Sequence, residues 1–141
     1  MARVSKQVLV MRKEFVIDGK KVTPRKGKYI AQGAHAAMAV LLNEMRKQDP
    51  SNKNKLSINL EEGSAMQDWF NGKFTKITTC VNTLDELMLV YNQAKEKGLP
   101  CSLITDSGAT EFNGEPTITC CAIGPAWVDE IDPITKELSL F

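Results

Sequence analysis

The strongest constraint on the fold is a helix with clear start and stop signals between two strand-like runs. Thr83-Leu-Asp-Glu86 has the pattern of a capping box, in which both side chains accept bonds from backbone N–H groups at the start of a helix. Gly98 and Pro100 end this helix, because glycine favours a C-terminal cap and proline cannot continue the helix. Apolar residues at 76–81 and 101–105 predict buried strands on either side. Strands joined through helices are typical of an α/β layer.

The other elements complete this pattern. An apolar run predicts a strand over 6–11, and a further strand runs over 117–123 until Gly124-Pro125 stops it. We expect a long helix over 27–47, a short helix over 61–71, and a short acidic turn around 127–131. The order predicts an α/β fold: a single domain over 1–141 with a four-stranded mixed β-sheet flanked by helices on both faces.

Charge is distributed unevenly along the chain. Residues 1–28 carry nine Lys and Arg against two acidic residues, whereas residues 101–141 carry one lysine against seven acidic residues. Asp18-Gly19 between two strand-like triplets predicts a small basic hairpin over about 14–25. Such a segment could bind phosphates, as on a nucleic-acid backbone, or be a solvated basic loop, and charge alone leaves both alternatives open.

Bulk composition narrows the class of protein. The 141 residues, 43% hydrophobic and 25% charged, match a soluble globular domain, and no apolar run approaches the roughly 18 residues of a membrane span. The four cysteines form no Cys-x-x-Cys pair and only one histidine is present, so we expect no metal site and free thiols in a reducing, cytoplasmic compartment. No Gly-x-Gly-x-x-Gly or P-loop pattern is present, so we expect no nucleotide cofactor. The N-terminus does not resemble a signal peptide.

The long predicted helix carries a candidate site. Lys28, Gln32 and His35 are related by i, i+4 and i+7 and share one stripe, and the residues between them are mostly Ala and Gly. Small residues let a substrate approach an amine, an amide and an imidazole. The alternative is that His35 is a partly buried helix residue with a hydrogen-bond partner. We expect the adjacent apolar stripe to pack on the sheet: Ile30, Ala31, Ala34, Met38, Leu41, Leu42 and Met45.

A second candidate group follows the third strand. Asp106 comes directly after it, Gly108 allows a tight turn and Thr110 offers a hydroxyl. The carboxyl ends of strands usually line the site crevice of an open α/β sheet, but an aspartate there can also simply order its own turn. Thr117 and Thr119 alternate along the last strand, where a buried threonine face without function is the simpler alternative.

Four segments together carry a resemblance to a known family: Lys28-Tyr-Ile-Ala-Gln-Gly-Ala-His-Ala36, Gly98-Leu-Pro-Cys-Ser-Leu-Ile-Thr-Asp-Ser-Gly-Ala-Thr110, Thr117-Ile-Thr-Cys-Cys-Ala-Ile-Gly-Pro125 and Ile131-Asp-Pro-Ile-Thr-Lys-Glu-Leu138. The chain resembles the archaeal and eukaryotic class of peptidyl-tRNA hydrolase. This resemblance implies hydrolysis of the ester between a peptide and tRNA, which releases tRNA for recycling. It also implies a protein that needs no cofactor, is often a homodimer and acts in the cytoplasm without a membrane.

The resemblance also implies which residues form the site. The catalytic group would be Asp106, His35, Lys28 and Thr110, with Gln32 and Thr119 binding substrate. Asp106 would orient or deprotonate water, directly or with His35, and Lys28 and Gln32 would donate to an oxyanion or a phosphate. Beyond the motifs, the basic side chains expected to contact the tRNA backbone are Lys20, Lys21, Arg25 and Lys26.

The chain departs from the family pattern in two respects. Cys80 stands where the family usually has a second lysine, and Lys76 would lie roughly 13 Å away along that strand. The segments at about 14–25 and 48–60 look longer than usual. Cys80 therefore favours an alternative, a tRNA-binding or protein-interaction module with little hydrolase activity. A general carboxyl-ester hydrolase unrelated to tRNA is disfavoured by the basic N-terminal segment.

Overall fold

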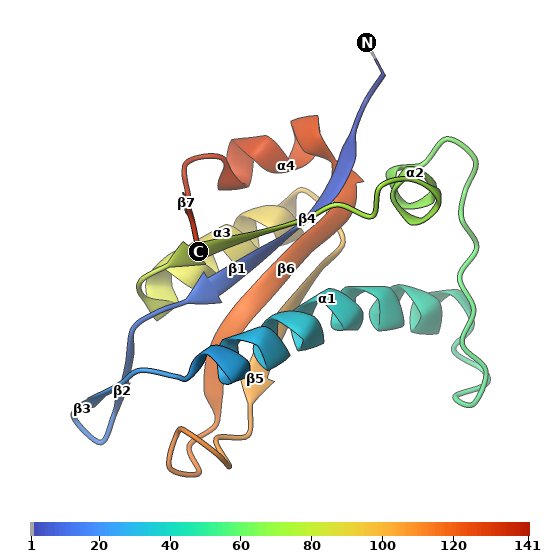
Figure 1. Ribbon diagram of the computed structural model, residues 1–141. Helices are drawn as coiled ribbons and strands as arrows, with labels where there is room; N and C mark the ends of the chain where they lie inside the picture. The colour runs from blue at the N-terminus through green and yellow to red at the C-terminus, as the bar shows by residue number, and fades with distance from the viewer. Residues whose placement is uncertain (1) are drawn as a thin grey trace.

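A mixed five-stranded sheet forms the centre of the computed structural model, which describes residues 2–141 (Figure 1). The strand order is β5 (Cys101–Asp106), β6 (Thr117–Trp127), β1 (Ser5–Arg12), β4 (Lys76–Val81) and β7 (Ser139–Leu140). Only β1 and β4 pair in parallel. The α/β class and the mixed sheet are confirmed, whereas the predicted strand count of four was too low. The fifth strand, β7, has two residues, which is too short to show a sequence period.

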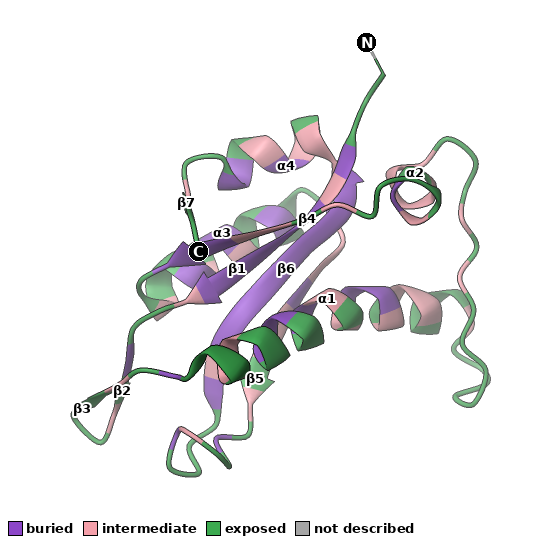
Figure 2. Ribbon diagram, in the orientation of Figure 1, coloured by how far each residue is buried: buried purple, intermediate pink, exposed green. Residues whose placement is uncertain are grey.

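Helices cover both faces of the sheet, as predicted. On β1, Leu9 and Met11 pack with α1 (Lys26–Gln48), while Val8 and Val10 face α3 (Leu84–Glu96) and α4 (Val128–Thr135). The side chains alternate because successive residues of a strand point to opposite faces. The short helix α2 (Ala65–Asn71) lies on the α1 side, where Asp68 accepts a hydrogen bond from Ser5 at 2.6 Å. Figure 2 shows buried strands at the centre and exposed outer helix faces.

The capped helix forms where the sequence predicts it. The Thr83 hydroxyl accepts a bond from the backbone N–H of Glu86 at 3.2 Å, and α3 begins at Leu84. The Glu86 carboxylate accepts from the N–H of Asn82 at 3.1 Å rather than from that of Thr83. The cap is thus shifted by one residue on one side, but it still satisfies N–H groups at the helix start.

Two boundaries near the C-terminal end differ from the prediction. Strand β6 does not stop at Gly124-Pro125 but continues to Trp127. A register shift in β1 between Lys6 and Val8 accommodates this irregular part of β6, and the buried Gln7 side chain donates to the Gly124 carbonyl at 3.1 Å. The acidic turn expected around 127–131 is the start of α4, which contains Pro133. Local stop signals were therefore overridden by tertiary contacts.

The face that α1 turns toward the sheet is the clearest correction. Ile30 is 73% exposed and Met38 is 52% exposed, so most of the predicted apolar stripe faces solvent. The buried residues of α1 are Gln32, Gly33, Ala36, Val40 and Leu41. A Cβ added at Gly33 would already lie 3.5 Å from the Leu9 side chain. The helix therefore packs by small side chains that permit close approach, and not by its most hydrophobic ones.

The basic hairpin is present as β2 (Phe15–Ile17) and β3 (Lys20–Val22), which form a separate two-stranded sheet. Asp18 and Gly19 have φ values of 52° and 75°, the left-handed conformation that a two-residue hairpin turn of this kind requires. The hairpin lies beside the N-terminal end of α1 (Figure 1). It therefore brings its lysines to the end of the helix that carries Lys28.

Leu87→Ala should destabilise the protein by about 2–5 kcal/mol, because Leu87 is fully buried between α3 and the sheet and its loss leaves a cavity. Leu89→Ala on the same helix is the matched control, since Leu89 is 61% exposed and should change stability by no more than about 0.5 kcal/mol. Urea unfolding measures both values. Equal effects would contradict the assigned packing face of α3.

Candidate active site

An ion pair joins the start of α1 to the end of β5. The Lys28 ammonium lies 3.1 Å from a carboxylate oxygen of Asp106 and donates to the Thr110 hydroxyl at 2.8 Å. The side chains of Lys28 and Asp106 are only 14% and 13% exposed. Three of the predicted catalytic residues therefore meet at one point, although they come from segments about 80 residues apart in the chain.

Gln32 connects this pair to the interior of the protein. Its side-chain NH₂ donates to Asp106 at 3.0 Å, and its oxygen accepts from the Thr119 hydroxyl at 2.6 Å. Gln32 and Thr119 are both buried, so the two bonds fix which way the amide points. Thr119 is thus part of the polar group, whereas Thr117 only donates to the nearby Glu115 carbonyl at 2.8 Å.

The second carboxylate oxygen of Asp106 is held by its own loop. It accepts from the backbone N–H of Gly108 at 2.8 Å. Gly108 has φ +82°, and a Cβ there would overlap the backbone of Glu115. Only glycine fits this turn without rearrangement. Asp106 therefore orders its own turn, as one alternative from the sequence proposed, and its other oxygen contacts Lys28 and Gln32.

Asp106 is held in its charged form. Burial of the carboxyl raises its pKa, but hydrogen bonds from Gly108, Lys28 and Gln32, together with the positive charge of Lys28, outweigh burial and lower the pKa below its usual range. The stabilisation from ionised Asp106 is complete above the pKa of an unfolded aspartate and is lost as the pH falls through the lower folded value. At neutral pH this carboxylate is a weak base, better suited to orienting water than to removing its proton.

A buried aromatic pair holds the loop after β5 in place. Phe112 and Phe15 are fully buried with their ring centroids 4.9 Å apart, and the Lys28 ammonium lies 5.6 Å from the Phe112 ring. Glu111 accepts from the Arg25 side chain at 2.8 Å, which ties the same loop to the residue before α1. Phe15, Glu111 and Phe112, which position this loop, were not predicted. The only signal was a lone aromatic residue in an otherwise polar loop.

His35 is not hydrogen-bonded to Asp106. Its side chain is exposed and makes no hydrogen bond with any residue from 2 to 141, so the alternative of a partly buried histidine with a hydrogen-bond partner is wrong. It lines an open hollow of about 550 Å³ between α1 and β5, together with Met38 and Thr105. A role for His35 would need contact with substrate.

The predicted basic residues surround the same end of α1. Lys20 and Lys21 are exposed on β3, and Lys26 is exposed at the first residue of α1. Arg25 lines an open hollow of about 360 Å³ with Lys28 and residues of the loop after β5. This hollow opens the Lys28 side of the polar group to solvent.

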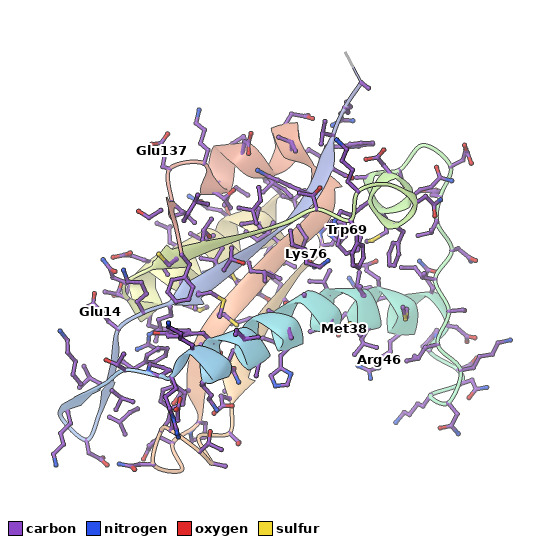
Figure 3. All side chains as sticks on the ribbon, in the orientation of Figure 1. Glu14, Met38, Arg46, Trp69, Lys76 and Glu137 are labelled. Carbon is purple, nitrogen blue, oxygen red and sulfur yellow. The ribbon has the colours of Figure 1, made fainter. Side chains whose placement is uncertain are left out.

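Cys80 and Lys76 lie outside this group. Cys80 is buried on β4, and its sulfur lies 3.7 Å from the Ser139 carbonyl of β7. The Lys76 ammonium sits 3.3 Å from the centroid of the Phe74 ring and 5.0 Å from that of Trp69, at the α2 end of the molecule (Figure 3). Lys76 therefore does not supply the cation that the family pattern would place at position 80.

The structure also bears on metal ions and membranes. Among residues 2–141, no group of three or more His, Cys, Asp and Glu side chains could hold a metal ion. Over the same residues, none of the helices has both the length and the apolar character needed to span a bilayer.

An α/β sheet with a polar group at the end of its edge strand defines the class of fold and site, and comparison with known proteins identifies the family. A family model described as "Peptidyl-tRNA hydrolase PTH2" matches residues 5–141. A peptidyl-tRNA hydrolase of Methanocaldococcus jannaschii is 35% identical over 136 residues, which cover 96% of this chain and 98% of the relative. One from Sulfolobus acidocaldarius is 40% identical over 116 residues, covering 82% and 88% of the two chains. The chain belongs to the peptidyl-tRNA hydrolase family.

Lys28→Met should raise the pKa of Asp106, because it removes a hydrogen bond and a positive charge while the carboxyl stays buried. The titration of the Asp106 carboxyl carbon, followed by NMR, measures the shift. Lys26→Met is the control, since Lys26 is an exposed lysine two residues away that makes no ion pair with residues 2–141. An unchanged Asp106 titration in Lys28→Met would show that the ion pair does not form in solution.

Proposed function

We propose that this chain hydrolyses the ester bond between a peptide and the terminal ribose of tRNA. Membership of the peptidyl-tRNA hydrolase family supports this reaction. The observation that carries it within the chain is the Lys28–Asp106 pair, with Gln32 and Thr110 bonded to it, beside a hollow open to solvent. The substrate is peptidyl-tRNA, and the products are a free peptide and a free tRNA.

The polar group can stabilise the oxyanion that develops during ester hydrolysis and can orient the water that attacks. Attack of water on the ester carbon creates an oxyanion, which needs a donor or a cation beside it. The Lys28 ammonium has three N–H groups and uses two of them on Asp106 and Thr110. Its third N–H is the candidate donor to the oxyanion. Asp106 would orient the attacking water, and Thr110 would position water or substrate.

The basic residues before and around the start of α1 would hold the tRNA. Lys20 and Lys21 form no ion pair with residues 2–141, whereas Arg25 is paired with Glu111 at 2.8 Å, so the unpaired positive charge of the hairpin comes from the two lysines. Phosphate contacts of this kind position a nucleic acid without reading its sequence. This suits an enzyme that accepts many tRNAs.

The alternative of a binding module with little activity is not favoured. It rested on Cys80, which forms no hydrogen bond with the Lys28–Asp106 pair, and the polar group forms without a lysine at that position. A homodimer and a cytoplasmic location, which the family resemblance implies, stay predictions.

Asp106→Asn should reduce the rate of release of an N-acetyl-aminoacyl group from tRNA by about 100-fold or more, because the neutral side chain cannot orient water for attack in the same way. The variant keeps the shape of the side chain, and thermal unfolding checks that it folds. Asp129→Asn is the control, since Asp129 is a surface carboxylate paired with Arg3 at 2.9 Å, away from the site. Near-wild-type turnover in a folded Asp106→Asn variant would refute the assignment.

Replacing Lys20 and Lys21 by glutamine should weaken tRNA binding and reduce its dependence on salt. Each lost phosphate contact should lower the slope of log affinity against log salt by roughly 0.7–0.9. Lys53→Gln with Lys55→Gln is the matched control, because these exposed lysines belong to the segment that follows the C-terminal end of α1 at Gln48. An equal slope in both double variants would rule out the hairpin as a tRNA contact.

A further inference from the structure

One edge of the sheet is open beside the candidate site. Strand β5 is the outermost strand and, within residues 2–141, pairs only with β6. The outer edge of such a strand presents unpaired N–H and C=O groups, which can bind another extended chain. Because β5 ends at Asp106, this free edge leads directly to the polar group that holds Lys28.

Two hollows follow this edge, one between α1 and β5 and one lined by residues of both α1 and α3. The hollow that contains His35 is about 550 Å³ and has a largely apolar wall, with Met38 and Leu42 on α1 facing Ile104 on β5. A second hollow of about 740 Å³ continues past Cys101, at the start of β5. We call the outer edge of residues 101–106 together with these two hollows the β5 track. Met38, labelled on α1 in Figure 3, is half exposed and lies along it.

We propose that the peptide part of peptidyl-tRNA binds in the β5 track as an added β-strand. This inference rests on the proposed function and names how that site holds its substrate. The esterified C-terminal residue of the peptide would lie at Asp106, and the preceding residues would run back toward Cys101. Since β5 itself runs from Cys101 to Asp106, the peptide would lie parallel to it.

The chemistry of the substrate explains why a strand edge suits it. Peptides attached to tRNA differ in side chains but share one backbone, so a general hydrolase must recognise the backbone. Hydrogen bonds along a strand edge do this without reading sequence. The apolar wall adds contact that tolerates many side chains, because methionine is flexible and adapts its shape. At about 3.3 Å per residue, the six residues of β5 can pair with about five or six peptide residues.

A second copy of this chain is the other occupant that a free strand edge could take. One feature favours the peptide. The track is continuous with the candidate site, since Thr105 lines the hollow and Asp106 forms the ion pair.

The test compares substrates that carry one, two, four or six residues, N-acetylated, on the same tRNA. For the wild-type protein we expect kcat/KM to rise at least tenfold from one to six residues. Methylation of single backbone nitrogens in the six-residue peptide should abolish most of this gain at every second position, since alternate N–H groups of an added strand face its partner. The proposal would be overturned if kcat/KM did not rise with peptide length, or if methylation did not reduce the rise.

Variants of the wall supply the matched comparison. Met38→Glu should reduce the ratio of six-residue to one-residue kcat/KM by at least threefold, whereas Leu89→Glu, a similarly exposed position on α3 outside the track, should keep the wild-type ratio. Equal ratios in both variants would overturn the proposal. So would a dimer, seen by light scattering, that Met38→Glu dissociates while the length dependence stays unchanged. If the wild-type protein releases no acyl group of any length from tRNA, the proposed function itself fails, which is a different result from a flat length dependence.

Discussion

The close approach of α1 to the sheet is the constraint on which the rest of the structure depends. Gly33 and Ala36 let the helix lie against Leu9 and Met11, and polar groups of the sheet then reach its backbone. The Ser102 hydroxyl donates to the Ala36 carbonyl at 2.8 Å, and the Cys120 thiol donates to that of Gln32 at 3.3 Å. Larger side chains on this face would push the helix outward and separate Gln32 from Thr119.

This packing also explains why the site is held rigidly before substrate binds. Gln32 is bonded on both sides, and Asp106 accepts from Gln32 and Lys28 on the helix and from Gly108 in its own loop. A partly buried ion pair is costly unless its remaining hydrogen-bonding groups are satisfied, and here both carboxylate oxygens of Asp106 have partners. The Phe15–Phe112 pair packs behind the loop and keeps these partners in position. The charged groups therefore need little rearrangement when charge develops on a substrate.

Local signals in the sequence predicted those parts of the fold that local physics determines. The capped helix α3 and the strand β4 have the expected positions because cap residues and apolar runs act within a few residues. The buried face of α1 could not be predicted in this way. Hydrophobicity favoured Ile30 and Met38, but the sheet lies so close to the helix that only small residues such as Gly33 and Ala36 fit there. Phe112 was missed because its partner Phe15 lies almost a hundred residues away.

The predicted stripe of Lys28, Gln32 and His35 lies on one side of α1, but the surroundings of these three residues differ for a geometric reason. At about 100° per residue, Lys28 and His35 lie roughly 40° and 60° from Gln32 on the same side, so both turn away from the buried face. They are also about 10 Å apart along the helix axis, from its 1.5 Å rise per residue. The loop that carries Thr110 and Phe112 covers Lys28 but ends before it reaches His35. The same stripe thus places the ordered ammonium of Lys28 at the polar group and the imidazole of His35 beside the open β5 track.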